Sequence, residues 1–533
     1  MNRSRLLPTY YFLLTLTSIK KQFIKNVGSG WLAVFVTGLV GFLSLPLNLK
    51  HLGTELYGIS ALAVSTLTLF SFLSMGMQPA LLRFFSHAVA EKDREKFKSL
   101  SSMAQLLLGG LGFIGAIGFL CTYPWFVAIY QVPENVRRDL FILFLAIAFD
   151  FWANLFLIPF TTVIQAGNRF DVGNMQQCLA KVLRIIVLFV GYSFFSPSLL
   201  ILAASTFAGT FYQLTSLVFL AYRIHGNAIF FHRKSLRWNL LPPLFSFSVW
   251  NFISQVSVGL SIQLPMLIIG KTLGVDMVAA FSPAIVLSSF CSTILIQVSA
   301  PLVPIASKDI VESGGKNLGR WAIQMGEITA SLGCSIVIVF ALFGSEIITA
   351  WLGESFAWIG MIVTITVMGI VFNGIQTTNY RLVLGGSASI APIALSAVVI
   401  TVVASMGTLL GTVYGGWSLL EVALLITLAR LLRNFFYLAI YFSRRLNYSI
   451  VDYAWRVQVK PLLMGLSVIC FFHIIKWQIP FSLVNIPALV LSSLLVACVY
   501  LSLCWKFVLH DDIKNSVLKL VASKFVKAGS NAK

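Results

Sequence analysis

The feature that most constrains this chain is a series of apolar stretches, each long enough to cross a lipid bilayer. A helix rises about 1.5 Å per residue, so roughly 20 apolar residues cross the ~30 Å of hydrocarbon. The sequence therefore predicts an all-α integral membrane protein with about 14 transmembrane helices. Their approximate bounds are 27–49, 57–80, 100–122, 140–164, 178–196, 199–222, 243–269, 277–303, 321–343, 358–380, 390–413, 417–440, 460–479 and 484–505.

The composition excludes a large soluble domain. Of the 533 residues, 58% are hydrophobic and only 11% are charged, whereas a soluble domain carries about 25% charged residues. The segments between the apolar stretches are short, and none could fold into a separate catalytic domain on either face of the membrane.

The positions of the positive charges predict the orientation of the chain. If the N-terminus lies inside, 33 of the 38 Lys and Arg residues fall in inner segments and five in outer ones. This bias obeys the positive-inside rule and places both termini in the cytoplasm. It also accounts for the net charge of +20 without a nucleic-acid partner.

An internal repeat predicts the architecture. The Leu-Gly pairs ending at Gly53 and Gly274 lie 221 residues apart, and Pro79 and Pro301 lie 222 apart. Because an even number of helices returns the chain to the same face, we expect two parallel six-helix lobes followed by two extra helices, with alternating access to a central cleft. The expected parts are a basic interfacial segment (1–26), an N-lobe (27–222), a cytoplasmic connector (223–242), a C-lobe (243–445), helices 13 and 14 (446–509) and a basic cytoplasmic tail (510–533).

The sequence contains no recognisable catalytic or cofactor motif. Gly270-Lys271-Thr272 resembles the end of a phosphate-binding loop, but Pro265 stands where that loop requires glycine. The histidines lack metal-ligand spacing. We therefore expect no enzyme activity, no catalytic residue, no metal and no cofactor.

Charged residues inside the predicted helices are the candidate functional residues. Each costs about 2.5–3.5 kcal/mol at the centre of a spanning helix, so each needs a compensating contact. One interpretation is a polar cleft that receives a charged substrate or a coupling ion; the other is ion pairing between helices, or snorkelling of basic groups to the interface. The candidates for the cleft are Arg83, Asp150, Lys181, Arg184, Glu327 and Arg430. Glu421 is a further acidic group, near the outer end of its helix, and intramembrane amides such as Gln376 and Asn379 either bind ligand or hold helices together.

A family resemblance is carried by the connectors between the helices. Leu52-Gly53-Thr54-Glu55-Leu56-Tyr57-Gly58 resembles the LG-x-E-x-YG signature of polysaccharide flippases, and Gln165-Ala166-Gly167-Asn168-Arg169 is similar to their short inner turn. The chain thus resembles the Wzx-type flippases of the multidrug/oligosaccharidyl-lipid/polysaccharide (MOP) exporter superfamily. The resemblance implies a MATE-like fold in the bacterial inner membrane. It also implies transport of a polyprenyl-pyrophosphate-linked oligosaccharide, an O-antigen or other surface-polysaccharide repeat, with membrane lipids and polysaccharide assembly proteins as partners.

Other functions remain open at this point. A multidrug cation antiporter of the same superfamily would need acidic groups in the cleft, and this chain offers more basic ones. A membrane-embedded glycan polymerase or ligase would need a large outer loop, which the sequence does not provide. A scaffold that recruits assembly proteins without transporting anything is a further alternative.

Overall fold

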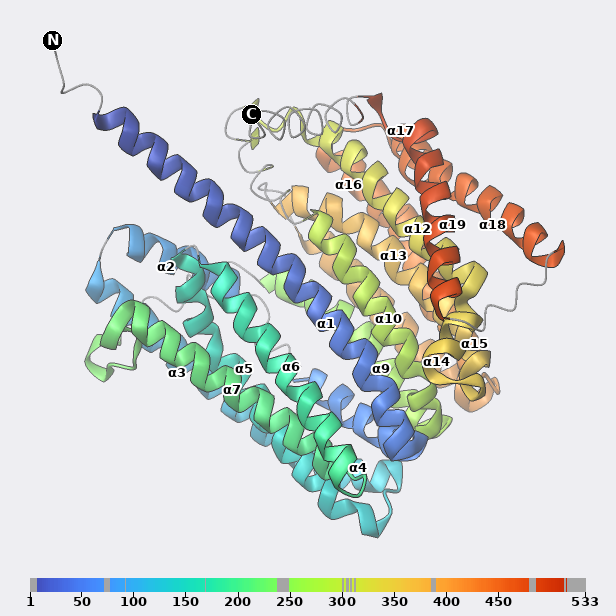
Figure 1. Ribbon diagram of the computed structural model, residues 1–533, viewed down its shortest axis with the longest axis horizontal. Helices are drawn as coiled ribbons and strands as arrows, with labels where there is room; N and C mark the ends of the chain where they lie inside the picture. The colour runs from blue at the N-terminus through green and yellow to red at the C-terminus, as the bar shows by residue number, and fades with distance from the viewer. Residues whose placement is uncertain are drawn as a thin grey trace. The chain divides into compact units, whose positions relative to one another are not determined.

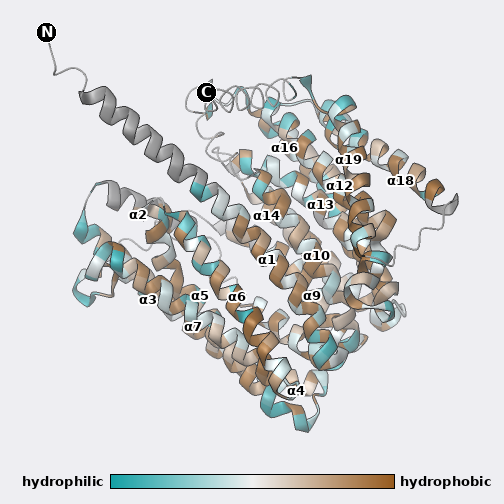
Figure 2. Cartoon of the chain, viewed as in Figure 1, coloured by the Kyte–Doolittle hydropathy of each residue, from teal (hydrophilic) through white to brown (hydrophobic). Residues whose placement is uncertain are grey.

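The computed structural model describes residues 7–70, 77–91, 93–167, 169–236, 249–299, 302, 306, 309–310, 313–384, 390–478, 486–511 and 514. Within these ranges all regular structure is helical, and 13 helices are long and apolar enough to cross a membrane. Hydrophobic residues run along these helices (Figure 2). The predicted all-helical, multi-pass membrane fold is confirmed.

The chain divides into two compact units, residues 1–279 and 280–533. In the first unit α3, α5 and α7 lie side by side, and α6 lies between α7 and α1 (Figure 1). Its elements are α1 (Leu7–Thr68), α2 (Met77–Ala90), α3 (Arg94–Cys121), α4 (Tyr123–Tyr130), α5 (Glu134–Ala166), α6 (Phe170–Phe194), α7 (Leu199–His225), η3 (Gly226–Ile229), η4 (Arg233–Ser235) and α9 (Val249–Thr272).

The second unit is organised around α12, which packs against α13, α18 and α19. Two short segments of π-helix, η7 and η8, interrupt the α-helices near its C-terminal half. Its elements are α10 (Val275–Ser299, beginning in the first unit), α12 (Leu318–Leu352), η6 (Glu354–Ile359), α13 (Gly360–Leu384), α14 (Ala391–Tyr414), α15 (Leu419–Leu432), η7 (Arg433–Leu438), α16 (Ala439–Leu446), α17 (Ile450–Tyr453), η8 (Ala454–Val459), α18 (Lys460–Gln478) and α19 (Ile486–Phe507).

The helix α1 contains the first predicted span and the first half of the second. Gly53 interrupts it with φ 76° and ψ 176°, so the chain turns where the sequence predicts the loop between the two spans. The second span was predicted to continue to residue 80, and this bound is wrong: the helix ends at Thr68. The hydroxyls of Thr66 and Thr68 donate to carbonyls one turn back, a contact that competes with regular helical bonding.

The spacing of the sequence repeat recurs in the backbone. Gly53 and Gly274, 221 residues apart, both have positive φ, at 76° and 101°. The ends of α6 and α14 are 220 residues apart, as are the starts of α7 and α15. The lobe boundaries 27–222 and 243–445 stay predictions, since the compact units divide at Ala279 instead.

Parts of three other predicted segments fall outside the described residues. They are positions 1–6 of the N-terminal segment, 237–242 of the connector, and the tail 510–533 apart from His510, Asp511 and Lys514. The remainder of the N-terminal segment belongs to α1, which runs from Leu7 without a break into the first span.

Candidate functional site

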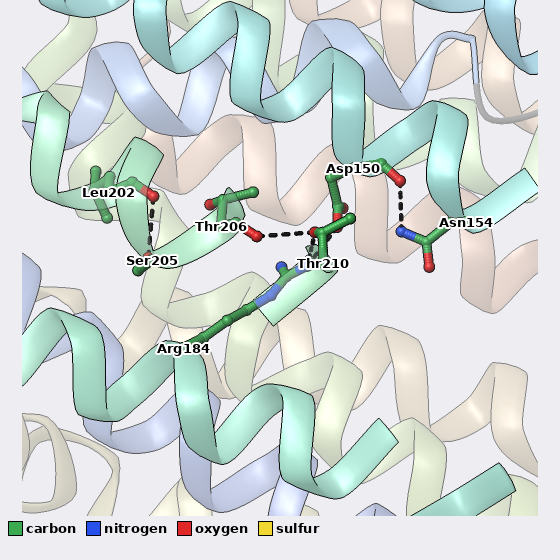
Figure 3. A network of polar contacts seen from close by, with 7 residues as sticks. All are labelled: Asp150, Asn154, Arg184, Leu202, Ser205, Thr206 and Thr210. Atoms are coloured by element: carbon green, nitrogen blue, oxygen red, sulfur yellow. Dashed lines mark hydrogen bonds and ion pairs between the residues drawn. The ribbon is translucent and has the colours of Figure 1, made fainter. Parts of the chain in front are cut away.

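An ion pair and the hydrogen bonds around it join three helices inside the first unit. The guanidinium of Arg184 on α6 donates to Asp150 Oδ1 on α5 and, at 2.9 Å, to Thr210 Oγ1 on α7. The Thr210 hydroxyl also donates to Asp150 Oδ1, so one carboxylate oxygen accepts from both neighbours (Figure 3). Asn154 Nδ2 donates to the Asp150 carbonyl at 2.7 Å. The Arg184 charge is thereby neutralised within the helix bundle.

A glycine gives Arg184 the space for this contact. A Cβ at Gly209 would lie 2.3 Å from Arg184 Cγ and 2.6 Å from its Nε, so any larger residue would displace the side chain. Gly209 immediately precedes Thr210 on α7, and the small residue therefore allows Arg184 to lie across α7 and reach both Thr210 and Asp150.

Lys181 lies one turn before Arg184 on α6, and its contacts are different. Its Nζ donates to Thr37 Oγ1 on α1 at 2.6 Å. The part of the chain that the structure describes places no carboxylate within salt-bridge distance of this ammonium. Of the two cations on α6, Arg184 pairs with Asp150 and Lys181 pairs with a neutral hydroxyl, so the three residues together carry one excess positive charge within a spanning segment.

The contact between Lys181 and Thr37 belongs to a series that we call the α1–α6 ladder. Its four rungs are Asn26 with the Asp171 amide (3.2 Å), Ser29 with Asn174 (3.1 Å), Thr37 with Lys181 (2.6 Å) and Asn48 with Tyr192 (3.0 Å). The paired residue numbers differ by 144 or 145 in every rung. Since the numbers increase together, α1 and α6 run parallel and in register, and the two helices cross the membrane in the same direction.

Glu327 lies in the second unit and is almost completely buried, with 1% of its surface exposed. Its Oε2 accepts a hydrogen bond from the His510 amide at 2.9 Å, just after α19 ends. Its Oε1 has no hydrogen-bond partner among the described residues. This carboxylate joins α12 to the end of α19.

The two remaining cleft candidates are both basic: Arg83 lies in the first unit and Arg430 in the second. Arg430 is 7% exposed on α15, and its neighbour Arg433 donates to Ser396 Oγ at 2.9 Å and to the Ile393 carbonyl at 3.3 Å. Arg83 lies on α2, and its side chain is outside what the structure describes. Of the six candidates, the structure brings Asp150, Lys181 and Arg184 together in one unit.

The intramembrane amides Gln376 and Asn379 hold helices together. Asn379 Nδ2 donates to Gln376 Oε1 at 3.0 Å and to the Tyr453 hydroxyl at 2.8 Å, and Gln376 Nε2 donates to the Asn434 carbonyl at 2.7 Å. Asn379 is fully buried. The network links α13 to the π-helical segment η7 and to α17, which favours the packing interpretation of these two amides.

Sequence reasoning missed the residues that complete the cluster around Lys181 and Arg184. Thr37 also donates to the carbonyl one turn back at 2.6 Å, the ordinary behaviour of a hydroxyl in an apolar helix. The single proton of the Thr210 hydroxyl is shared between Asp150 Oδ1 and the Thr206 carbonyl, which lies at 2.8 Å. No local pattern distinguishes them from other threonines. Gly209 carried a weak signal, as a small residue in the middle of a spanning helix.

The family is decided by comparison with known sequences. The family described as "Polysaccharide biosynthesis protein" matches residues 23–308, which is 286 of 533 residues and more than half of the chain. The chain belongs to the polysaccharide biosynthesis protein family. This confirms the resemblance to the MOP exporters. A further relative of this family member is "Uncharacterized membrane protein EpsK" of Bacillus subtilis (strain 168), 22% identical over 523 residues, which cover 93% of this chain and 98% of EpsK.

Solved structures similar to this polysaccharide biosynthesis family member show the same fold. The structure titled "Lipid II flippase MurJ, inward closed conformation" superimposes with a TM-score of 0.66 at 13% identity, covering 90% of this chain and 98% of MurJ. An inward-facing MATE multidrug transporter of the MOP superfamily gives 0.57 at 13% identity, covering 80% and 94%. The Vibrio cholerae MATE transporter VcmN gives 0.56 at 14% identity, covering 82% and 100%. The MATE-like fold is confirmed.

Proposed function

We propose that this family member flips a polyprenyl-pyrophosphate-linked oligosaccharide across the bacterial inner membrane. The observation that carries the proposal is the excess positive charge at Lys181, beside the neutral pair of Arg184 and Asp150. An ammonium without an acidic partner is costly in a spanning helix, and it is a natural receptor for phosphate oxygens. A pyrophosphate-linked lipid carries such an anion through the membrane.

The energetics of this transport need no motor domain. A pyrophosphate carries about two negative charges, and a membrane potential that is negative inside favours their outward movement. At ~100 mV the gain is about 4.6 kcal/mol for two charges. This agrees with a sequence in which no ATP-binding motif was found. In this proposal Asp150 orients Arg184 and limits the local charge, so that the anion is held but also released.

The family and the fold support the transport class. Membership of the polysaccharide biosynthesis family points to a glycan pathway, and the MurJ structure is titled a lipid II flippase. We propose that the substrate is an O-antigen or related surface-polysaccharide repeat, with membrane lipids and polysaccharide assembly proteins as partners. The bias of the positive charges supports cytoplasmic N- and C-termini.

The antiporter alternative is favoured by the similarity to MATE transporters and opposed by the charge of the cluster. A cation-binding site needs an acidic excess, whereas the three residues Asp150, Lys181 and Arg184 carry a positive one. We also propose that the protein is not an enzyme. If a proton or Na⁺ is coupled to transport, Asp150 or Glu327 is the acid involved, and amide replacement of each under an imposed ion gradient tests this hypothesis.

Deletion of the gene tests the proposed function. We expect loss of surface polysaccharide and accumulation of the lipid-linked repeat on the cytoplasmic side. Complementation with Lys181→Gln should fail, and Lys181→Arg should restore export in part. Lys98→Gln, at a half-buried lysine paired with Glu95, should restore it fully. Normal surface polysaccharide in the deletion strain, together with altered efflux of organic cations, would instead support the antiporter.

A further inference from the structure

We infer that Lys181 is a latch between α6 and α1, which the phosphate groups of the substrate release. The inference rests on the proposed function and adds to it a way for the binding site to act on α1. Thr37 accepts from Lys181 Nζ at 2.6 Å, and this hydrogen bond joins the two helices at this level. An anion bound to the same ammonium replaces Thr37 and removes this hydrogen bond between α1 and α6.

The charges of the cluster make Lys181 the residue that exchanges partners. Arg184 already donates to Asp150 and Thr210 and is packed against Gly209. Lys181 has three N–H donors, and Thr37 offers it a neutral hydroxyl. A phosphate oxygen adds to the hydrogen bond a Coulomb attraction that the hydroxyl lacks, and this attraction is strong where water is scarce. We therefore expect the anion to draw the flexible ammonium away from Thr37, while Arg184 keeps its bond to Asp150.

The position of this rung explains why its loss would matter. Between the rungs at Ser29 and Asn48, α1 extends for 19 residues, roughly 28 Å of helix, and the Thr37 rung is the single rung of the ladder in that interval. Pro46 lies within the same helix, two residues before Asn48. Since proline removes a backbone hydrogen bond and promotes a bend, release at Thr37 leaves the middle of α1 able to bend at Pro46.

The Thr37 hydroxyl has a second role, before any anion binds. A bare ammonium inside the bilayer is costly, and Thr37 supplies it with an acceptor that is weak enough to be displaced. Thr37 keeps its own donor bond to the Ala33 carbonyl, at 2.6 Å, so it needs no new partner when Lys181 leaves. The exchange therefore leaves neither side chain without a hydrogen bond.

Two measurements on the full-length protein in nanodiscs test the latch, with inorganic pyrophosphate as the probe. The first is the affinity for pyrophosphate. The second is the distance between spin labels at Leu39→Cys on α1 and Ile186→Cys on α6, in a background without the native cysteines; both positions are exposed. The variants are Thr37→Val, which removes the acceptor at nearly constant shape, Thr37→Ser, which keeps it, and Lys181→Gln with Lys181→Arg.

We expect pyrophosphate to lengthen or broaden the α1–α6 distance in the wild type and in Thr37→Ser. Thr37→Val should show that released distribution without pyrophosphate and should bind the probe several-fold more tightly, because the competing hydroxyl is gone. If Thr37→Val matches the wild type in both measurements while Lys181→Gln loses binding, the latch is wrong and the proposed anion site stands. If Lys181→Gln binds pyrophosphate as well as Lys181→Arg does, the anion site is wrong, and the latch with it.

Discussion

At the scale of single residues, the environment of α6 gives two neighbouring basic side chains different roles. Arg184 meets the carboxylate of Asp150, whereas Lys181, one turn earlier, meets the hydroxyl of Thr37. A guanidinium pairs with a carboxylate in a fixed geometry, while an ammonium is a compact charge that changes partners easily. Arg184 is therefore suited to holding helices together, and Lys181 is suited to binding a ligand.

Neutralising Asp150 tests the structural role of the pair. Asp150→Asn leaves Arg184 without its charged partner in a partly buried position, and we expect unfolding to become easier by about 1–3 kcal/mol. The double variant Asp150→Asn/Arg184→Gln should recover part of this loss, because no unpaired charge remains. Thermal unfolding in detergent measures both, and a double variant less stable than Asp150→Asn alone would contradict the pairing.

Substitution of Gly209 tests the path of the Arg184 side chain. Gly209→Ala would place a methyl group 2.3 Å from Arg184 Cγ, so the guanidinium should leave Asp150 and Thr210. We expect transport to fall several-fold in complemented cells at near-normal protein levels. Gly173→Ala on α6 is the matched control, since its nearest neighbour is Thr161 Cγ2 at 3.9 Å. Equal transport by the two variants would contradict this account of Gly209.

The turn before α12 provides a prediction on pH. Asp309 lies outside the spanning segments and accepts from Asn317 Nδ2 at 2.7 Å and from the Ser313 hydroxyl at 2.8 Å. The bond from Asn317 is the main cause that lowers the pKa of Asp309 below its ordinary value of 3.8. Its stabilising contribution is therefore complete above that value and is lost only as the pH falls through the lower folded pKa.

Hydrogen exchange at the Asn317 amide measures this effect, because that amide also donates to Asp309 at 3.1 Å. Once the intrinsic rate is corrected, its protection should be equal at pH 7 and pH 5, and Asp309→Ala should lower it several-fold at both. A loss of protection in the wild type between pH 7 and pH 5 would show that the carboxylate titrates in that range and would contradict the lowered pKa.

Some residues of the candidate site could be recognised from the sequence and others could not, for a physical reason. A charge in a spanning helix is rare and costly, so Asp150, Lys181 and Arg184 were identifiable. Their partners Thr37 and Thr210 are hydroxyls that bond their own backbone in any helix, and only the three-dimensional fold brings them to the charges. The position of Glu421 could also be explained from the sequence, because Ser418 and Glu421 form a capping box at the start of α15.

At the scale of elements, glycines set how closely helices approach. In the first unit a Cβ at Gly58 of α1 would lie 2.1 Å from the Val275 carbonyl oxygen at the start of α10. Nearby, Tyr130 donates to the Leu267 carbonyl of α9 at 3.2 Å. In the Leu-Gly-x-Glu-x-Tyr-Gly segment, the first glycine, Gly53, therefore allows the chain to turn. The last glycine, Gly58, allows close packing of the helices.

Gly58→Ala tests this close approach. Because the obstacle is backbone rather than a flexible side chain, we expect a destabilisation of roughly 1–3 kcal/mol. Gly259→Ala on α9 is the control, as a Cβ there meets nothing within 4 Å. Thermal unfolding of the purified variants measures the difference, and a Gly58→Ala protein as stable as Gly259→Ala would show that the backbones are not in contact.

The limits of the helices were predicted less well than their existence. Apolar length identified the spans because the bilayer thickness fixes it. The same criterion extended the second span to residue 80, whereas the helix ends at Thr68 and α2 begins at Met77. Hydrophobicity continues across that break, so apolar length alone could not locate it.

At the scale of the whole molecule, the internal repeat and the bias of the positive charges were the features of the sequence that predicted the arrangement of the helices. Glycines at matching positions, Gly53 and Gly274, both adopt positive φ, and the positive charges predict the orientation. The parallel course of α1 and α6 agrees with that predicted topology, in which both helices run from the inner to the outer face. The identity of the transported glycan has no comparable physical signature in the sequence.

The most direct test of the account is transport of a defined substrate by the purified protein. In proteoliposomes that contain a fluorescent polyprenyl-pyrophosphate oligosaccharide, the wild type should move the lipid between leaflets. A membrane potential that drives anions outward should accelerate the outward movement. Lys181→Gln should reduce the rate at least tenfold and Lys98→Gln should leave it unchanged. Movement of the lipid at the rate of protein-free vesicles, or equal rates for Lys181→Gln and the wild type, would contradict the account.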